Sequence, residues 1–155
     1  MNGDGTPQTE WSRGVTLTEG PFAGWTTWSQ GDDPYETIIG PFYFKTGADG
    51  RAQCAFEPKP HHCNGGGSIH GGCLMSFADF SLFGIAHNAL AGGHAVTLTF
   101  SSEFIGAGGL TGLVEARGEV IRDTRSVVFI RGIVTQAERP LLSFSGTLKK
   151  LARRE

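Results

Sequence analysis

The chain has 155 residues with 13 basic and 15 acidic side chains, so its formal net charge is −2 and no basic surface for nucleic acid or a membrane is indicated. No run approaches the ~20 apolar residues of a membrane-spanning helix, and the polar first residues lack the pattern of a signal peptide. Three cysteines, Cys54, Cys63 and Cys73, leave one thiol unpaired in any disulfide scheme. We therefore expect a globular protein of the cytoplasm with one domain core.

The first 34 residues are rich in Gly, Pro, Thr and Trp. We expect residues 1–34 to form an N-terminal extension that is loose or contains a short helix, with a helix or turn near residues 21–29. A folded domain is expected over residues 35–152. Its first two strands are predicted at residues 38–45, where Gly40-Pro41 interrupts an apolar run, and at residues 51–57.

One long helix is predicted over residues 71–90, because apolar residues recur there at helical spacing and two glycines follow. Four long strands are then predicted at residues 95–104, 112–122, 126–136 and 141–151. In the first of them Val96, Leu98 and Phe100 alternate with polar residues and are expected to face the core. A helix that is apolar on all sides must be covered by the sheet. The prediction is an α+β hotdog fold, in which a curved antiparallel sheet of about six strands wraps a long central helix.

The most informative segment leads into this helix and reads Asn64-Gly65-Gly66-Gly67-Ser68-Ile69-His70-Gly71-Gly72. Its glycines let backbone amides approach a ligand at a helix start. The helix then carries a single acid, Asp79, where an apolar residue would be expected. Amide groups near a lone carboxylate on an apolar helix favour carbonyl chemistry, since they can serve as an oxyanion site and as a base or nucleophile.

The spacing of these groups has a geometric consequence. Gly71 and Asp79 are eight positions apart on the predicted helix, which corresponds to ~12 Å along its axis. Reacting groups must come within about 3–3.5 Å of a shared substrate atom. If Gly71 and Asp79 act on the same carbonyl, they must come from two copies of the chain. The sequence therefore favours an active site shared across a dimer.

A family resemblance rests on the same residues. Asn64, Gly67, His70-Gly71-Gly72 and Asp79 match the pattern N-x-x-G-x-x-H-G-G-x(6)-D. The pattern, the helix and the four strands after it together resemble the hotdog acyl-CoA thioesterases of the phenylacetic-acid-degradation (PaaI-like) type. The resemblance implies an enzyme that hydrolyses acyl- or aroyl-CoA to a free acid and coenzyme A. It also implies a homodimer or homotetramer that needs no metal or other cofactor.

The resemblance assigns roles to three residues at the reacting bond. Asp79 is expected to be the general base or the nucleophile, and the sequence leaves the choice open. The Gly71 N–H is expected to donate to the thioester oxygen from the partner subunit. Thr97 lies eighteen positions after Asp79 and is expected to bind the attacking water, although a β-branched strand residue is the plain structural alternative.

Four more residues are expected around them. Asn64 is expected to place the substrate or water, or else only to cap a turn. His70 is expected either to polarise the carbonyl or to support the loop. Gly67 and Gly72 are expected to bind substrate, or only to allow close packing. Where relatives often have a proline after the corresponding strand, this chain has Phe104-Ile105-Gly106-Ala107, so the loop at the pocket rim is expected to differ.

Other readings of the sequence remain as alternatives. A zinc site at His61-His62-Cys63 with Cys54 is disfavoured because the spacing matches no standard ligand set. A Cys–His nucleophile pair that uses Cys63 or Cys73 has no flanking signature. Two other functions fit a hotdog fold, namely an enoyl-thioester hydratase or dehydratase and a non-catalytic acyl-CoA binder. The sequence does not identify the acyl group.

Overall fold

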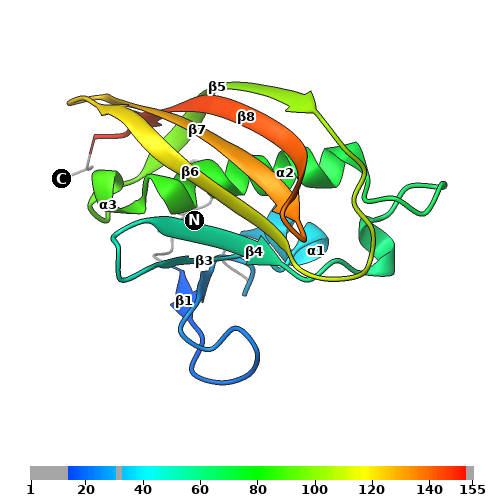
Figure 1. Cartoon of the computed structure of the whole chain (residues 1–155). Helices are drawn as coiled ribbons and strands as arrows, with labels where there is room; N and C mark the ends of the chain where they lie inside the picture. The colour runs from blue at the N-terminus through cyan, green and yellow to red at the C-terminus, as the bar shows by residue number, and fades with distance from the viewer. Residues whose placement is uncertain (1–13, 31–32, 153–155) are drawn as a thin grey trace, which may run out of the picture.

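The computed structural model describes residues 14–30 and 33–152. One antiparallel sheet of eight strands curves around a long helix (Figure 1). The strand order is β1-β2-β3-β4-β6-β7-β8-β5, so β5 is an edge strand that is reached by a crossover. Within the described residues, no helix has both the length and the apolar character needed to span a bilayer.

The elements follow in chain order as β1 (Val15–Thr16), β2 (Thr26–Thr27), α1 (Pro34–Ile39), β3 (Tyr43–Thr46), β4 (Ala52–Phe56), a 3₁₀ turn (Pro60–His62), α2 (Gly71–Ile85), α3 (His87–Leu90), β5 (Ala95–Phe104), β6 (Val114–Asp123), β7 (Val127–Gln136) and β8 (Arg139–Lys150). The predicted architecture is therefore confirmed. The six predicted strands correspond to β3–β8, and the two additional strands are the two-residue β1 and β2. The predicted helix is divided at Ala86, where the backbone leaves helical geometry between α2 and α3.

The prediction of a strand over residues 38–45 is wrong in its first part, because residues 34–39 form helix α1. Asp33 caps this helix, since its Oδ1 accepts from the Glu36 N–H at 3.0 Å, and Pro34 occupies the first turn. The strand begins only at Tyr43, after Gly40-Pro41. Helix α1 also crosses the boundary that the sequence suggested between residues 34 and 35. Residues 1–13 of the expected extension lie outside the described part of the chain, and residues 21–24 form a turn.

Helix α2 is buried over most of its surface by the concave face of the sheet. Its buried side chains include Phe77, Leu82 and Ile85, which pack with residues of β3, β4 and β6–β8. Two glycines allow the close approach. A Cβ on Gly84 would lie 2.7 Å from the Cys54 sulfur, and a Cβ on Gly146 would lie 2.5 Å from a Leu82 methyl. The sheet can therefore bend tightly around the helix.

Strand β5 carries an irregularity that the alternating pattern did not predict. Its register with β8 shifts between Thr97 and Thr99, so Leu98 is the inserted residue of a bulge. Leu98 is 57% exposed, and the expectation that it faces the core is wrong. Thr97 instead turns toward α2, on the same side as the buried Ala95. The bulge thus places a hydroxyl beside the helix.

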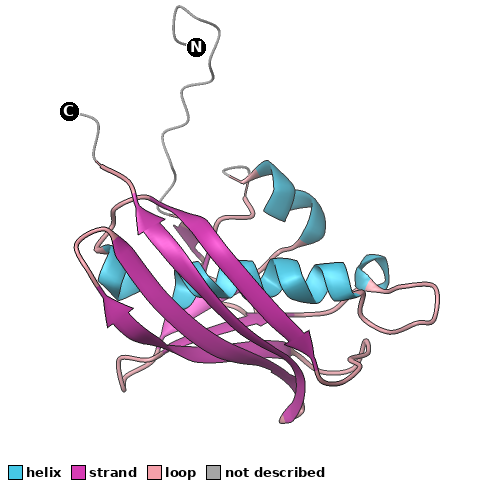
Figure 2. Cartoon of the chain, turned by 90° about the horizontal axis from the view of Figure 1, so that it is seen from above, coloured by secondary structure: helices cyan, strands magenta, loops and turns pink. Residues whose placement is uncertain are grey.

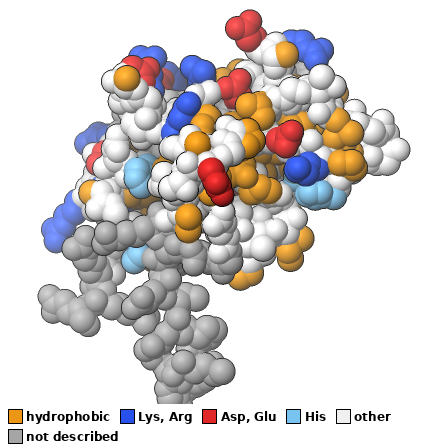
Figure 3. All heavy atoms as spheres, turned by 90° about the horizontal axis from the view of Figure 1, so that it is seen from below, with side chains coloured by type: hydrophobic (Ala, Val, Ile, Leu, Met, Phe, Trp, Pro, Cys, Tyr) orange, Lys and Arg blue, Asp and Glu red, His pale blue; other side chains and the backbone are white. Residues whose placement is uncertain are grey.

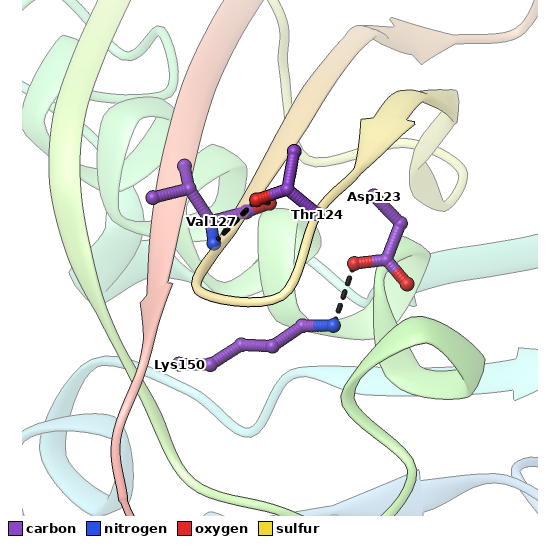
Figure 4. Close-up of polar contacts among 4 residues, drawn as sticks. All are labelled: Asp123, Thr124, Val127 and Lys150. Atoms are coloured by element: carbon purple, nitrogen blue, oxygen red, sulfur yellow. Dashed lines mark hydrogen bonds and ion pairs between the residues drawn. The ribbon is translucent and has the colours of Figure 1, made fainter.

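Short turns join the long strands. Ala137 and Glu138 both adopt positive φ between β7 and β8, as a two-residue hairpin requires. Between β6 and β7 the Thr124 Oγ1 donates to the Val127 carbonyl and accepts from the Val127 N–H (Figure 4). Beside this turn, Lys150 of β8 pairs with Asp123 at 2.6 Å. These contacts fix one end of the curved sheet.

A second, smaller apolar cluster joins the N-terminal part to the sheet. Phe22 and Trp25 are buried there with Ala55, and Phe22 stacks on Tyr43 with ring centroids 3.9 Å apart. On the side of the molecule seen from below, hydrophobic side chains gather near the middle, with charged groups spread around them (Figure 3). This part of the surface is therefore not uniformly polar.

Candidate active site

The side of α2 that the sheet leaves open carries the candidate site. Phe77, Ala78 and Leu82 are fully buried, whereas Gly72, Ser76 and Asp79 remain accessible. These three residues follow one another at spacings of four and three, so they lie on one helix face. Helix α1 lies beside α2 at this side (Figure 2), where the Tyr35 hydroxyl and the Ser76 Oγ are 2.9 Å apart.

Asp79 and Thr97 are brought together by the fold. Thr97 Oγ1 donates to Asp79 Oδ1 at 2.7 Å, from β5 to α2. Burial raises the pKa of the Asp79 carboxyl above its ordinary value, the Thr97 hydrogen bond lowers it, and the charge of Asp33 raises it further. A carboxylate with a raised pKa is a stronger base than that of a fully exposed aspartate. Asp79 also remains accessible to a substrate.

The His-Gly-Gly turn is built as a helix start. The His70 Nδ1 accepts from the Gly72 N–H at 2.8 Å, so His70 caps α2. Because Nδ1 is the acceptor, the neutral ring carries its proton on Nε2. The Gly71 N–H has no acceptor among the described residues. Of the two glycine amides, Gly71 is therefore the one that can donate to a ligand at the positive end of the helix.

The loop before this turn is closed by its own hydrogen bonds. Asn64 Oδ1 accepts from the N–H groups of Gly66 and Ser68, at 2.9 and 3.2 Å. Gly67 has a φ of +80° and donates its N–H to the Asn64 carbonyl. The Ile69 N–H donates to the Gly108 carbonyl, which ties the loop to the segment between β5 and β6. In the single chain Asn64 therefore shapes the loop, and its side-chain NH₂ remains available to a ligand.

Gly71 and Asp79 are not brought together within one chain. Both belong to the continuous helix α2, and their eight-residue separation corresponds to ~12 Å. The ring of Phe104, at the end of β5, lies against Gly71, where a Cβ would be 3.0 Å from it. Phe104 is 57% exposed. The segment in which this chain departs from the family pattern thus begins directly beside the amide.

Helix α1 also contributes to this site, which the sequence pattern did not predict. This helix brings Tyr35 to Ser76 and places Glu36 where its carboxyl group and that of Asp79 interact electrostatically. The signal was present in Asp33-Pro34 followed by an acid at Glu36, a helix-start pattern that the apolar run after it obscured. Only the folded chain shows that α1 borders the open face of α2.

Glu36 is a half-buried acid without a cationic partner among the described ion pairs. Burial raises its pKa from 4.5 to about 8, and the charges of Asp33 and Asp79 add to this. The Ser29 Oγ donates to Glu36 Oε2 at 3.4 Å, which opposes the rise only weakly. Glu36 is therefore expected to hold its proton at neutral pH.

Replacing Glu36 by Gln should stabilise the protein in alkaline but not in acidic solution. The unfolded chain releases the Glu36 proton near pH 4.5 and the folded chain near pH 8, so wild type loses stability as the pH rises between these values. We expect the advantage of Glu36→Gln in the free energy of unfolding to grow by about 2 kcal/mol or more from pH 5 to pH 8. Urea unfolding at several pH values measures it. Glu19→Gln, at an exposed loop position, is the control, and parallel curves for Glu36→Gln and wild type would contradict the assignment.

Among the histidines and cysteines of the metal and thiol alternatives, His62 makes structural hydrogen bonds, and the thiols of Cys54 and Cys73 have raised pKa values. The buried His62 bonds the Ile39 carbonyl through Nε2 at 2.8 Å and accepts from the Lys59 N–H through Nδ1 at 2.9 Å. Burial raises the pKa of the Cys73 thiol to about 11 and that of Cys54 to about 12. Such thiols are protonated near neutral pH and are poor nucleophiles. Within the described residues, no group of three or more His, Cys, Asp or Glu side chains could hold a metal ion.

Comparison with known proteins places this geometry in a family. The sequence profile of the Thioesterase superfamily matches residues 66–143, which is half of the chain. The chain belongs to the thioesterase superfamily. The matched range contains the Gly71 amide, Asp79 and Thr97, and the hotdog fold predicted from the sequence is the fold of its structural neighbours.

Three relatives show the extent of the similarity. A mutant of the phenylacetic acid degradation protein PaaI from Thermus thermophilus is 30% identical, with 77% of this chain and 100% of that chain covered and a TM-score of 0.64. A hypothetical thioesterase with coenzyme A from Streptococcus pneumoniae is 21% identical, with 78% and 95% covered and a TM-score of 0.66. The Pseudomonas aeruginosa protein PA0474, provisionally named an esterase, is 27% identical over 114 residues, which are 73% of this chain and 85% of that protein.

Proposed function

We propose that this protein hydrolyses the thioester bond of an acyl- or aroyl-coenzyme A and releases a free acid and coenzyme A. The observation that carries the proposal is the accessible Asp79 carboxylate, held by Thr97 at 2.7 Å on a helix with no other charged residue. Membership of the thioesterase superfamily supports it. So do the likeness to PaaI and the coenzyme A in the structure of the S. pneumoniae relative.

The residues supply both parts of a hydrolytic mechanism. Asp79 either takes a proton from water as the water oxygen attacks the thioester carbon, or attacks that carbon itself and forms a mixed anhydride that water then cleaves. In both routes the carbonyl oxygen gains negative charge, which the Gly71 N–H stabilises at the start of α2. The carbon–sulfur bond then breaks, and the coenzyme A thiolate leaves and takes up a proton.

The proposed site is completed by a second copy of the chain. Asp79 of one subunit faces a thioester whose oxygen is bound by the Gly71 N–H of the other, because one helix cannot present both to one carbonyl. Strand β5 carries Thr97 and is a ten-residue edge of the described sheet. A long exposed edge favours pairing with another chain. The proposal is therefore a homodimer as the minimal active unit, with a tetramer as a further expectation.

The supporting residues have secondary roles in this proposal. His70 fixes the turn through the Gly72 N–H and presents Nε2–H outward. Asn64 shapes the loop through Oδ1 and offers its NH₂ to substrate or water. Gly67 supplies the positive φ of the loop. Substrate binding by Gly67 and Gly72 is thus proposed to be indirect, through the shape of the loop, and no cofactor is proposed.

Release of free thiol from a panel of acyl-coenzyme A esters tests the proposal. We expect purified wild type to release thiol from at least one short-chain, medium-chain or aromatic ester, measured with a thiol-reactive dye. Hydration of crotonyl-CoA without thiol release would instead identify a hydratase. Tight binding of an acyl-CoA with neither reaction would identify a binding protein. Either of these results would overturn the proposed hydrolysis.

A further inference from the structure

Helix α1 lies beside the open face of α2 and is held at both of its ends by hydrogen bonds. Its start is capped by Asp33, and the Thr37 Oγ1 donates to the Asp33 carbonyl at 2.8 Å. At its end the Ile39 carbonyl is bonded by the buried His62 at 2.8 Å. Tyr35 is therefore presented by an element fixed at both ends, and its position is set before any substrate arrives.

A chain of hydroxyl groups anchors Tyr35 to α2. The Ser76 Oγ donates its single proton to the Gly72 carbonyl at 2.9 Å, so in the 2.9 Å contact between the two hydroxyls Tyr35 is the donor. Ser76 lies three residues before Asp79 and five after Gly71, or ~4.5 and ~7.5 Å along the axis. The tip of Tyr35 is thus anchored between the carboxylate and the amide of its own chain.

Tyr35 is more exposed than a residue with a purely structural role needs to be. In the single chain the residue is 61% exposed although its hydroxyl is hydrogen-bonded, and Met75, which precedes Ser76 in the sequence, is 39% exposed. Helix α1 already packs on the core through Ile39, and its Glu36 is half-buried. An aromatic ring that is held in place and left uncovered is suited to contact a ligand.

The charges around α1 indicate which part of the substrate lies there. The acidic groups that interact electrostatically on this side are Asp33, Glu36 and Asp79. None of them forms an ion pair with Lys or Arg among the described residues. Because Glu36 holds its proton at neutral pH, the negative charge on this side is that of Asp33 and Asp79. This charge would repel the phosphates of coenzyme A and an acyl group that ends in a carboxylate. An uncharged acyl group is compatible with it.

We infer that Tyr35 is a specificity-determining residue whose ring forms a wall for the uncharged acyl group of the substrate. This inference rests on the proposed hydrolysis. On this inference an acetyl group does not reach the wall from the thioester carbon, whereas a hexanoyl or phenylacetyl group does. Tyr35 therefore selects among acyl groups without taking part in bond breaking.

The test compares kcat/KM for hexanoyl-CoA, acetyl-CoA and adipoyl-CoA, the last having a chain of hexanoyl length that ends in a carboxylate. For Tyr35→Ala we expect the hexanoyl-to-acetyl ratio to fall by about tenfold or more, with acetyl-CoA hydrolysis within about threefold of wild type as evidence of an intact fold. Tyr35→Phe, which keeps the ring, should keep most of the ratio, and so should Ile38→Ala at the 75% exposed neighbouring position. Wild type should prefer hexanoyl-CoA to adipoyl-CoA by at least about tenfold.

Two outcomes with Tyr35→Ala would overturn the inference. One is an unchanged hexanoyl-to-acetyl ratio in Tyr35→Ala, and another is an equal fall for all esters, which would indicate a structural role. Should Tyr35→Ala not fold, Tyr35→Trp replaces it. The larger ring must then change the hexanoyl-to-acetyl ratio while acetyl-CoA is still hydrolysed, and an unchanged ratio would overturn the inference. Failure of wild type to hydrolyse any ester would overturn the proposed function as well, so the two failures are distinguishable.

Discussion

Asp79→Asn is expected to lower kcat/KM for acyl-CoA hydrolysis by about 10²–10⁴-fold, the range typical of removing a general base. The amide keeps the size of the side chain and can still accept the Thr97 hydroxyl proton, so the fold should persist. It cannot accept a proton from water or attack a thioester. Thiol release measured across pH is the assay, with circular dichroism to verify folding.

The pH profile separates a chemical role from a structural one. Because burial raises the pKa of Asp79, wild-type kcat/KM should rise with pH through a value above that of an exposed aspartate, as the carboxylate forms. Thr97→Val removes the hydrogen bond that lowers this pKa, so the rise should move to higher pH. Asp123→Asn, at the exposed last residue of β6, is the matched control and should keep wild-type activity. Asp79→Asn with near-wild-type activity would exclude Asp79 from the mechanism.

The sequence predicted the long helix α2 and the long strands β5–β8 well, because their apolar residues recur with a strong periodicity. The apolar positions of α2 and the long runs of β5–β8 bury large areas, so local pattern and final packing agree. The juxtaposition of Asp79 and Thr97 also followed from the family resemblance, although the two residues lie on different elements. The alternating pattern did not predict the bulge at the inserted residue Leu98, beside which Thr97 points toward α2.

The features that were missed depend on contacts distant in sequence. Helix α1 has six residues, too few for a periodic signal, and it is stabilised from outside by His62 and Ser76. The partial burial of Glu36 follows from that docking and cannot be predicted from the residues around it in sequence. Strands β1 and β2 have two residues each and exist only as additions to β3. The local sequence therefore did not predict the elements that are short and stabilised by contacts with their neighbours.

Mixing two inactive variants should restore activity if the site is shared between subunits. The first variant is Asp79→Asn. The second is Gly71→Pro, which removes the N–H that has no acceptor among the described residues. Proline is tolerated at the first position of a helix, and His70 has the extended backbone (φ −63°, ψ 136°) that precedes proline well. Loss of one oxyanion donor should lower kcat by about 10²–10³-fold. Gly71→Ala places the same Cβ against the exposed Phe104 and keeps the N–H, so it is the matched control.

In a mixed dimer one site combines both defects and the other combines Asp79 of the proline variant with the Gly71 N–H of the asparagine variant. Random pairing of equal amounts gives mixed dimers in half of the population, each with one intact site of two, and so about a quarter of wild-type activity. Co-expression with two different affinity tags and sequential purification isolates the mixed dimers, in which activity should reach about half of wild type. A site contained in one chain predicts no recovery, because every chain then carries a defect. Purified mixed dimers that remain as inactive as their parents would therefore show that Asp79 and Gly71 do not act on one thioester from opposite subunits.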